Sequence, residues 1–244
     1  MGKGKYRSDF NWLFDLWGLV MKKIVFIGDH FRTVFEKIIS PIGVFLARIG
    51  IPPNFISVIG LILSITAGLV YATGSFFWAA WVVVLAGCCD TLDGILARST
   101  GKETAFGAFF DSTLDRYSDM FILTGLVWVF AGGPLLWCAQ ETEISPYQSP
   151  LTVFFIIMAM VGSFMVSYTR ARAEGLGVDC RVGFLQRPER IILLIIGSLM
   201  GSIPFVGLVL MKLTLLVLAV LSNLTAIQRM IYVRNQLAKE RQIL

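Results

Sequence analysis

The chain has 244 residues, of which 56% are hydrophobic and 15% charged, and its mean hydropathy is +0.76. Soluble globular domains carry about 25% charged residues, so this composition excludes an ordinary soluble domain and indicates an integral membrane protein. The net charge of +5 does not indicate a nucleic-acid-binding domain, because the basic residues flank apolar segments. Anionic lipid headgroups and phosphorylated substrates are the partners that this pattern favours.

The first 51 residues are expected to lie at the membrane surface. Residues 1–9 form a basic tail, which does not resemble a cleavable signal peptide. From Phe10 to Ile51, aromatic and aliphatic residues alternate with Lys and Arg, and no run reaches the roughly 18 to 20 apolar residues that a crossing needs. We therefore expect an interfacial amphipathic helix and then a short second helix that ends near Arg48.

Six apolar segments follow, and they predict an all-α membrane protein with six transmembrane helices. Asn54 is the expected N-cap of the first. The chain then divides into a surface segment (1–51), a six-helix domain (52–235) and a polar tail (236–244). The six helices are expected at about 54–74, 76–98, 107–131, 151–173, 189–208 and 210–234.

The distribution of cationic residues predicts the orientation of these helices. With the N-terminus inside, 20 of the 21 Lys and Arg residues fall on one side of the membrane, and Lys212 falls on the other. Cytoplasmic loops are enriched in Lys and Arg. We therefore expect a multi-pass protein of the cell's inner membrane, with both termini at the cytoplasmic side.

Four aspartates stand at one end of two adjacent predicted helices. Asp90 and Asp93 are three residues apart, and Asp111 and Asp115 are four apart, so each pair lies on one helix face. A charged side chain inside the membrane costs roughly 2.5 to 3.5 kcal/mol on insertion scales, so compensation by divalent metal is expected. All-oxygen ligands favour Mg²⁺, Mn²⁺ or Ca²⁺. The alternative is that these are helix-terminal acids at an aqueous boundary.

The aspartates belong to a longer pattern, D-x2-D-G-x2-A-R-x8-G-x3-D-x3-D, over residues 90–115. At all eight positions it resembles the signature of the CDP-alcohol phosphotransferase family, and the resemblance covers most of residues 50–235. It implies a metal-dependent transferase with two Mg²⁺ or Mn²⁺ ions at the cytoplasmic face. One ion is expected at Asp90, Asp93 and Asp111, and the other at Asp90, Asp111 and Asp115. Asp115 is also the expected general base.

The resemblance assigns further residues to a CDP-linked lipid. Three small residues would let the helices and a nucleotide approach closely, although small residues also simply pack membrane helices. Arg98 is expected to contact the pyrophosphate or cytidine, and Thr104 is compatible with a CDP contact or with a plain loop role. The full set expected to bind the CDP-lipid is Pro53, Asn54, Phe55, Ile56, Gly94, Ala97, Arg98, Thr104 and Gly107.

Arginines are concentrated in residues 167–190. Arg170 follows a long apolar segment and Arg190 begins another, while Arg187 and Arg190 are three apart and share a helix face. Arg229 lies inside the last predicted helix. Because arginine suits bidentate recognition of phosphate, Arg170, Arg190 and Arg229 are expected to bind the phosphate of the acceptor. The alternatives are solvated cations of an inside loop and, for Arg229, a snorkelling side chain.

The segments SYTRARAE and GFLQRPER resemble those of the family's subgroup that uses inositol phosphate as acceptor, in which a lysine often stands at the position of Arg170. We therefore expect transfer of a phosphatidyl-type group from CDP-diacylglycerol, or a related CDP-lipid, to inositol phosphate, releasing CMP in phospholipid biosynthesis. Another family member, such as a phosphatidylglycerophosphate synthase, is the nearest alternative, and a cation transporter is the alternative of another class. The resemblance also implies a homodimer. Asp119 is compatible with supporting the site or with helix packing.

Overall fold

The computed structural model describes residues 35–101, 103–133, 147–180 and 182–243. The chain divides into two compact units, residues 1–38 and 39–244, and the second contains the features analysed below. The predicted tail and the predicted interfacial helix up to residue 34 lie outside the described residues. Residues 35–49 are helical, in the region where the sequence predicts a short helix ending near Arg48.

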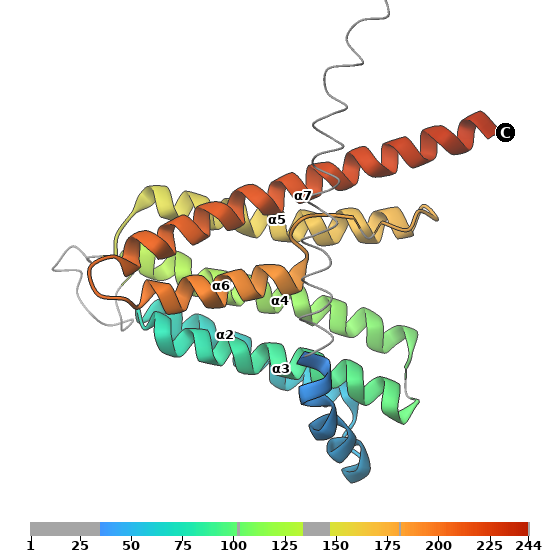
Figure 1. Ribbon diagram of the computed structural model, residues 1–244, viewed down its shortest axis with the longest axis horizontal. Coiled ribbons are helices and arrows are strands. Elements are labelled where there is room, and N and C mark those ends of the chain that lie inside the picture. Colours follow the sequence, from blue (N-terminus) through green and yellow to red (C-terminus); the bar gives the residue numbers. More distant parts are fainter. Residues whose placement is uncertain (1–34, 102, 134–146, 181, 244) are drawn as a thin grey trace, which may run out of the picture. The chain divides into compact units, whose positions relative to one another are not determined.

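Among the described residues of the second unit, six long helices run in alternating directions (Figure 1). The connections from α3 to α4 and from α5 to α6 lie at the same end of the bundle. The helix bounds are α2 Pro53–Ala72, α3 Phe76–Thr100, α4 Ala105–Phe130, α5 Pro150–Glu174, α6 Arg187–Gly201 and α7 Gly207–Ile243.

Three predicted boundaries differ from the structure. The prediction that Asn54 caps α2 is wrong, because Pro52 occupies the N-cap position and Pro53 takes the first helical position, where its missing N–H costs nothing. Helix α6 ends at Gly201 rather than near residue 208, because Pro204 follows and disfavours helix in the residue before it. Helix α7 continues to Ile243, since its polar end is rich in good helix formers.

Four of the helices in the described part of the chain are long and apolar enough to cross a bilayer. They are α2, α3, α5 and residues Gly207–Lys239 of α7. Helix α4 has 26 residues but contains four charged residues between positions 111 and 119, namely Asp111, Asp115, Arg116 and Asp119. Helix α6 has 15 residues, which corresponds to roughly 22 Å against a hydrocarbon core of about 30 Å.

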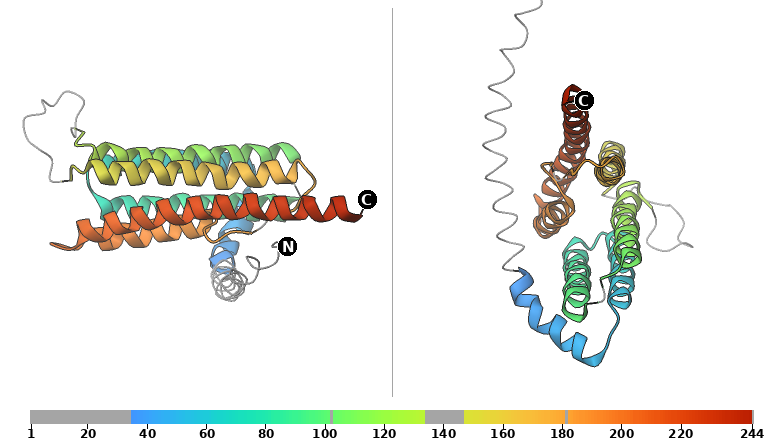
Figure 2. Two further views of the ribbon diagram at one scale, coloured as in Figure 1. Left: turned by 90° about the horizontal axis from the view of Figure 1, so that it is seen from above. Right: turned by 90° about the vertical axis from the view of Figure 1, so that its right-hand side faces the viewer.

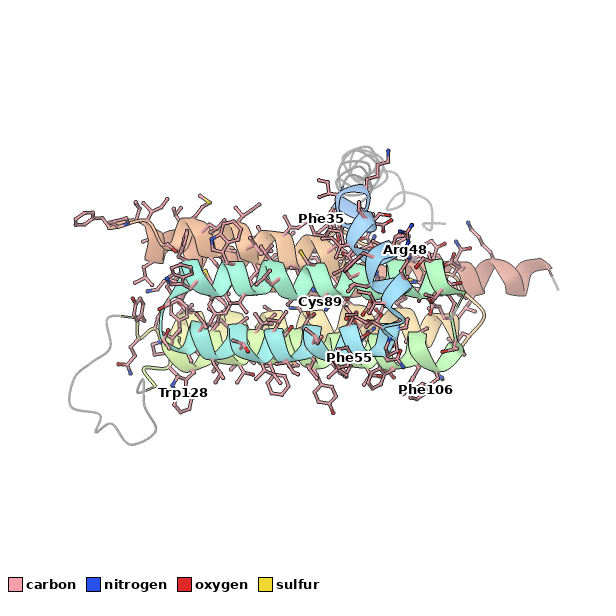
Figure 3. All side chains as sticks on the ribbon, turned by 90° about the horizontal axis from the view of Figure 1, so that it is seen from below. Phe35, Arg48, Phe55, Cys89, Phe106 and Trp128 are labelled. Carbon is pink, nitrogen blue, oxygen red and sulfur yellow. The ribbon has the colours of Figure 1, made fainter. Side chains whose placement is uncertain are left out.

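The bundle consists of two groups of packed helices, α2 to α4 and α5 to α7, which can be told apart in the end-on view of Figure 2. Helix α2 packs against α3 and α4, and α5 packs against α7, while α6 contacts both α3 and α7. The side chains between them are buried and apolar, whereas Phe106 and Trp128 point away from the bundle (Figure 3). Fully buried members of the core include Tyr71, Leu126, Phe130, Ile156, Met211 and Leu215.

Helices α2 and α4 meet through two glycines. A methyl group on Gly125 would overlap the backbone carbonyl of Gly68, and one on Gly68 would overlap the carbonyl of Phe121. This is the small-residue packing by which membrane helices bring their backbones together. The contact matters for function because it fixes α4, which carries two of the four aspartates, against α2.

We expect Gly125→Ala to lower the thermal unfolding temperature of the detergent-purified protein by several degrees. Overpacking at a close contact costs about 1–3 kcal/mol, and here the obstacle is backbone. The matched control is Gly87→Ala, another helical glycine, where an added Cβ meets nothing within 4 Å. Equal unfolding temperatures for the two variants would contradict the proposed role of this contact.

Candidate active site

The aspartates are brought together by the short connection between α3 and α4. Helix α3 ends at Thr100 and is capped by Gly101, which adopts the left-handed conformation with φ +63° that glycine readily takes at a helix C-terminus. Helix α4 begins after Thr104, whose hydroxyl oxygen accepts a 2.9 Å hydrogen bond from the backbone N–H of Gly107. This N-cap stabilises the start of α4, so α4 begins a few residues after α3 ends, and both helices pack against α2.

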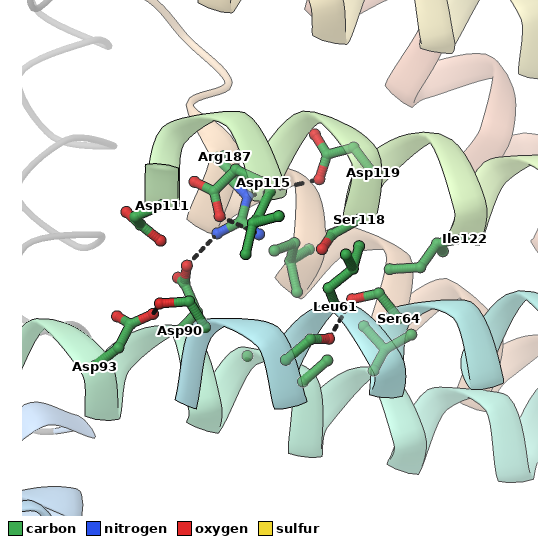
Figure 4. A pocket seen from close by; sticks show the side chains of 17 residues that line it. Leu61, Ser64, Asp90, Asp93, Asp111, Asp115, Ser118, Asp119, Ile122 and Arg187 are labelled. Atoms are coloured by element: carbon green, nitrogen blue, oxygen red, sulfur yellow. Dashed lines mark hydrogen bonds and ion pairs between the residues drawn. The ribbon is translucent and has the colours of Figure 1, made fainter. Parts of the chain in front are cut away.

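The four carboxylates line one pocket (Figure 4). Asp90, Asp111 and Asp115 each place one carboxylate oxygen within 4.8 Å of the others. Asp93 is outside this closest group, and its side chain accepts a 2.6 Å hydrogen bond from the hydroxyl of Ser57 on α2. The structure therefore brings three of the predicted ligands into direct proximity and keeps the fourth at the same pocket.

The residues of this pocket fit a hard divalent cation. The three clustered side chains present only carboxylate oxygens, the ligand type that Mg²⁺ and Mn²⁺ prefer. In all, five carboxylates and one guanidinium group line the pocket, so negative charge is in excess. Asp90, Asp111 and Asp115 could therefore hold a metal ion directly, with Asp93 positioned beside them.

Arg187, the first residue of α6, is the important residue that the sequence analysis left out of the site. Its Nη1 donates a 2.6 Å hydrogen bond to Asp90, and its Nη2 lies 2.9 Å from Asp115. Its Nε lies 3.6 Å from Asp119. Two signals in the sequence pointed to it: it shares a helix face with Arg190, and four carboxylates at the ends of apolar helices require a cation.

Asp119 lies one turn beyond Asp115 on α4 and lines the same pocket. Its Oδ2 accepts hydrogen bonds from Ser163 on α5 at 2.7 Å and from Arg190 on α6 at 2.9 Å. Of the two roles considered for Asp119, these contacts favour support of the site, since they link α4 to both α5 and α6.

The three arginines predicted to bind an acceptor phosphate have different surroundings. Arg170 forms an ion pair with Glu174 that is about half exposed, whereas Arg190 is 7% exposed and bound to Asp119. Arg229 is 2% exposed and donates to the backbone carbonyls of Val166 and Val182. The structure thus holds Arg190 and Arg229 inside the bundle. Their burial does not fit the alternatives of a solvated cation for Arg190 and a snorkelling side chain for Arg229.

The residues predicted to bind the CDP-lipid surround the α3–α4 connection and the start of α2. The side-chain oxygen of Asn54 lies 3.7 Å from the position that a Cβ on Gly107 would take, and Thr104 lies 3.0 Å from it. Gly94 lies under the guanidinium of Arg98, which is exposed. Phe55 is exposed and Ile56 is buried, while Ala97 is partly buried on α3. Asn54, Thr104 and Gly107 therefore form one local group.

Comparison with protein families assigns most of the chain to a known family model. The CDP-alcohol phosphatidyltransferase model matches residues 51–233. The archaetidylinositol phosphate synthase of Methanothermobacter thermautotrophicus is 39% identical over 209 residues, which cover 86% of this chain and 95% of that protein. The phosphatidylinositol phosphate synthase of Mycobacteroides abscessus is 35% identical, with 84% and 87% covered.

Solved structures show the same likeness in three dimensions. The Mycobacterium tuberculosis phosphatidylinositol phosphate synthase with CDP-DAG bound is 32% identical and aligns with a TM-score of 0.68, covering 81% of this chain and 94% of that one. The same enzyme in complex with manganese and citrate aligns with a TM-score of 0.67 at 32% identity, covering 80% and 88%.

We expect Arg187→Gln to bind Mn²⁺ about tenfold more tightly than the wild type, which corresponds to about 1.4 kcal/mol. The substitution removes a positive charge that contacts Asp90 and Asp115 and therefore competes with a metal ion for the same oxygens. Mn²⁺ titration of the detergent-purified protein, followed by electron paramagnetic resonance, measures the affinity. Arg172→Gln is the matched control, because Arg172 is exposed near the end of α5. Unchanged or weaker Mn²⁺ binding by Arg187→Gln would contradict the prediction.

Proposed function

Because the chain belongs to the CDP-alcohol phosphatidyltransferase family, we propose that it transfers a phosphatidyl-type group from CDP-diacylglycerol, or a related CDP-lipid, to inositol phosphate. The observation that carries the proposal is the convergence of Asp90, Asp111 and Asp115 within 4.8 Å in a chain whose relatives are named as inositol phosphate lipid synthases. In the reaction, the acceptor hydroxyl attacks the phosphorus that carries the lipid. The bond between the two phosphates then breaks, and CMP leaves.

Each aspartate has a proposed role. Asp90, Asp93, Asp111 and Asp115 are the ligands of two Mg²⁺ or Mn²⁺ ions, a proposal that the manganese complex of the Mycobacterium tuberculosis enzyme supports. Such ions, when bound, neutralise charge on the pyrophosphate and on the leaving phosphate. Asp115 accepts the proton of the acceptor hydroxyl. Its side chain is only 18% exposed, which limits competition from water.

The CDP-lipid is proposed to bind at the group of residues around the α3–α4 connection. Asn54, Thr104 and Gly107 lie together there, and Arg98 lies exposed on α3, where its guanidinium suits a phosphate oxygen. The proposed set also includes Gly94 and Ala97 on α3, and Pro53, Phe55 and Ile56 at the start of α2. The CDP-DAG complex of the related enzyme supports a CDP-linked lipid as the substrate class.

The acceptor phosphate is proposed to bind to Arg170, Arg190 and Arg229. Arg190 and Arg229 are buried cations, and a buried cation gains most from an anionic ligand because little water competes. Arg170 is the most exposed of the three and already pairs with Glu174, so it is proposed to contact the acceptor phosphate from the surface. The names of the archaeal and bacterial relatives support inositol phosphate as the acceptor.

The proposed topology has six crossings in the cell's inner membrane, with both termini and the aspartates at the cytoplasmic side. Helices α3 and α5 run in the same direction (Figure 1), so α4 must return across the membrane between them. Ser149, before α5, donates to the carbonyl of Phe130 at the end of α4, which supports this path. By the same reasoning α6 crosses between α5 and α7. The domain at 52–235 carries the activity, and a homodimer is proposed from the family.

We expect detergent-purified protein with CDP-diacylglycerol and Mg²⁺ or Mn²⁺ to release CMP with inositol phosphate as acceptor. The kcat/KM for inositol phosphate should exceed that for unphosphorylated inositol by about 100-fold or more. Unphosphorylated inositol carries no phosphate for the buried arginines Arg190 and Arg229 to bind. A higher kcat/KM with glycerol phosphate would indicate a phosphatidylglycerophosphate synthase instead. If no acceptor supports the release of CMP, the result would favour the alternative function of a cation transporter.

We expect Asp115→Asn to lower kcat by about 10²- to 10⁴-fold, the usual contribution of a general base. Asparagine keeps the shape of the side chain but cannot accept the proton. Asp179→Asn is the matched control, since Asp179 is an exposed acid in the connection between α5 and α6, and its kcat should stay within about twofold. A loss below about tenfold for Asp115→Asn would remove Asp115 from the role of base.

A further inference from the structure

Asp119 joins two arginines that serve different parts of the site. Its Oδ1 lies 3.6 Å from Nε of Arg187, and its Oδ2 lies 2.9 Å from Nη2 of Arg190. The hydroxyl of Ser163 donates to the same Oδ2 at 2.7 Å. A single carboxylate therefore accepts hydrogen bonds from Ser163 on α5 and Arg190 on α6, and it also forms a longer ion pair with Arg187 at the start of α6.

The contact with Arg187 orients the guanidinium of that residue. With Nε toward Asp119, its Nη1 and Nη2 extend to Asp90 at 2.6 Å and Asp115 at 2.9 Å. Figure 4 shows the guanidinium between these carboxylates. Because the guanidinium is planar and rigid, fixing one edge fixes the direction of the other nitrogens.

The contact with Arg190 leaves one of its nitrogens available. Nη2 is bound to Asp119, while Nη1 is buried and has no hydrogen-bond partner within the described ranges. Arg190 and Asp119 line a second pocket together with Ser163 and Ser222, and the Ser222 hydroxyl also lacks a partner there. A buried donor without a partner is costly, so Nη1 is a donor held ready for an anion.

The position of Asp119 also separates it from the proposed ligands of the metal. It lines both pockets, yet it is not part of the close carboxylate group of Asp90, Asp111 and Asp115. Its side chain is 13% exposed, and a carboxylate so buried needs paired cations. Arg187 and Arg190 meet that need, so Asp119 is occupied by the chain itself.

We propose that Asp119 is a positioning residue, which holds Arg190 in place for the acceptor phosphate and keeps Arg187 directed at the catalytic carboxylates. This inference rests on the proposed function, because it takes Arg190 to be a contact of the acceptor. Ser163 supports Asp119 by donating to the oxygen that Arg190 uses. Without the carboxylate, Arg190 loses its partner and is free to turn toward other acids of the site.

The test is a steady-state measurement of CMP release by full-length Asp119→Asn in detergent. The acceptor KM should rise about tenfold, while the KM of CDP-diacylglycerol changes less than about twofold. In an Arg190→Gln background, Asp119→Asn should raise the acceptor KM by less than about twofold more, because it acts through Arg190. Ser163→Ala should raise the acceptor KM by about two- to threefold. It provides the readout if Asp119→Asn fails to fold.

Ser198→Ala is the matched control, since Ser198 is a buried residue of α6 whose hydroxyl is hydrogen-bonded to Tyr71, away from the arginines. It should lower stability and leave both KM values within about twofold. An unchanged or lowered acceptor KM in both Asp119→Asn and Ser163→Ala, or a full additional effect of Asp119→Asn in the Arg190→Gln background, would overturn the proposal. If the wild type prefers another phosphorylated acceptor, the choice of substrate fails, and the same comparison with that acceptor still tests Asp119.

Discussion

The burial of several carboxylates within one apolar helix bundle is the constraint on which the rest of the site depends. Asp90 and Asp115 come from different helices, and Arg187 from a third helix contacts both. Removing a charge from water costs several kcal/mol, and an ion pair offsets this only when its geometry is good and its remaining hydrogen bonds are made. The contacts of 2.6 and 2.9 Å supply that geometry and tie α6 to α3 and α4, and the Nε of Arg187 adds a longer ion-pair contact of 3.6 Å with Asp119.

This pairing also explains how the two halves of the proposed reaction are coupled. Arg187 and Arg190 lie one turn apart at the start of α6, and Asp119 contacts both. The start of α6 is therefore fixed by the same acids that face the proposed metal and CDP-lipid sites, while Arg190 faces the proposed acceptor pocket. A shift of α6 would move both arginines together, so the donor and acceptor sides share one structural support.

The parts of this structure that depend on local patterns were predictable from the sequence. Apolar runs located the helices, and the spacing of Asp111 and Asp115 placed them on one face because the helical repeat is local. Arg187 was not assigned to the site, because its contact with Asp90 spans 97 residues and depends on how α6 packs against α3. The assignment of Asn54 as N-cap failed for a local reason, since Pro52 and Pro53 together satisfy the start of α2 without it.

A carboxylate cluster that relied on bound metal alone would make assembly of the helices depend on the ion, as it does in small metal-stabilised domains. Here the chain supplies part of the compensation itself, since Arg187 and Arg190 pair with acids of α3 and α4. Five carboxylates nevertheless line the pocket against the single guanidinium of Arg187. Arg187 therefore contributes to the placement of α6, and the remaining negative charge is what makes the same pocket attractive to divalent cations.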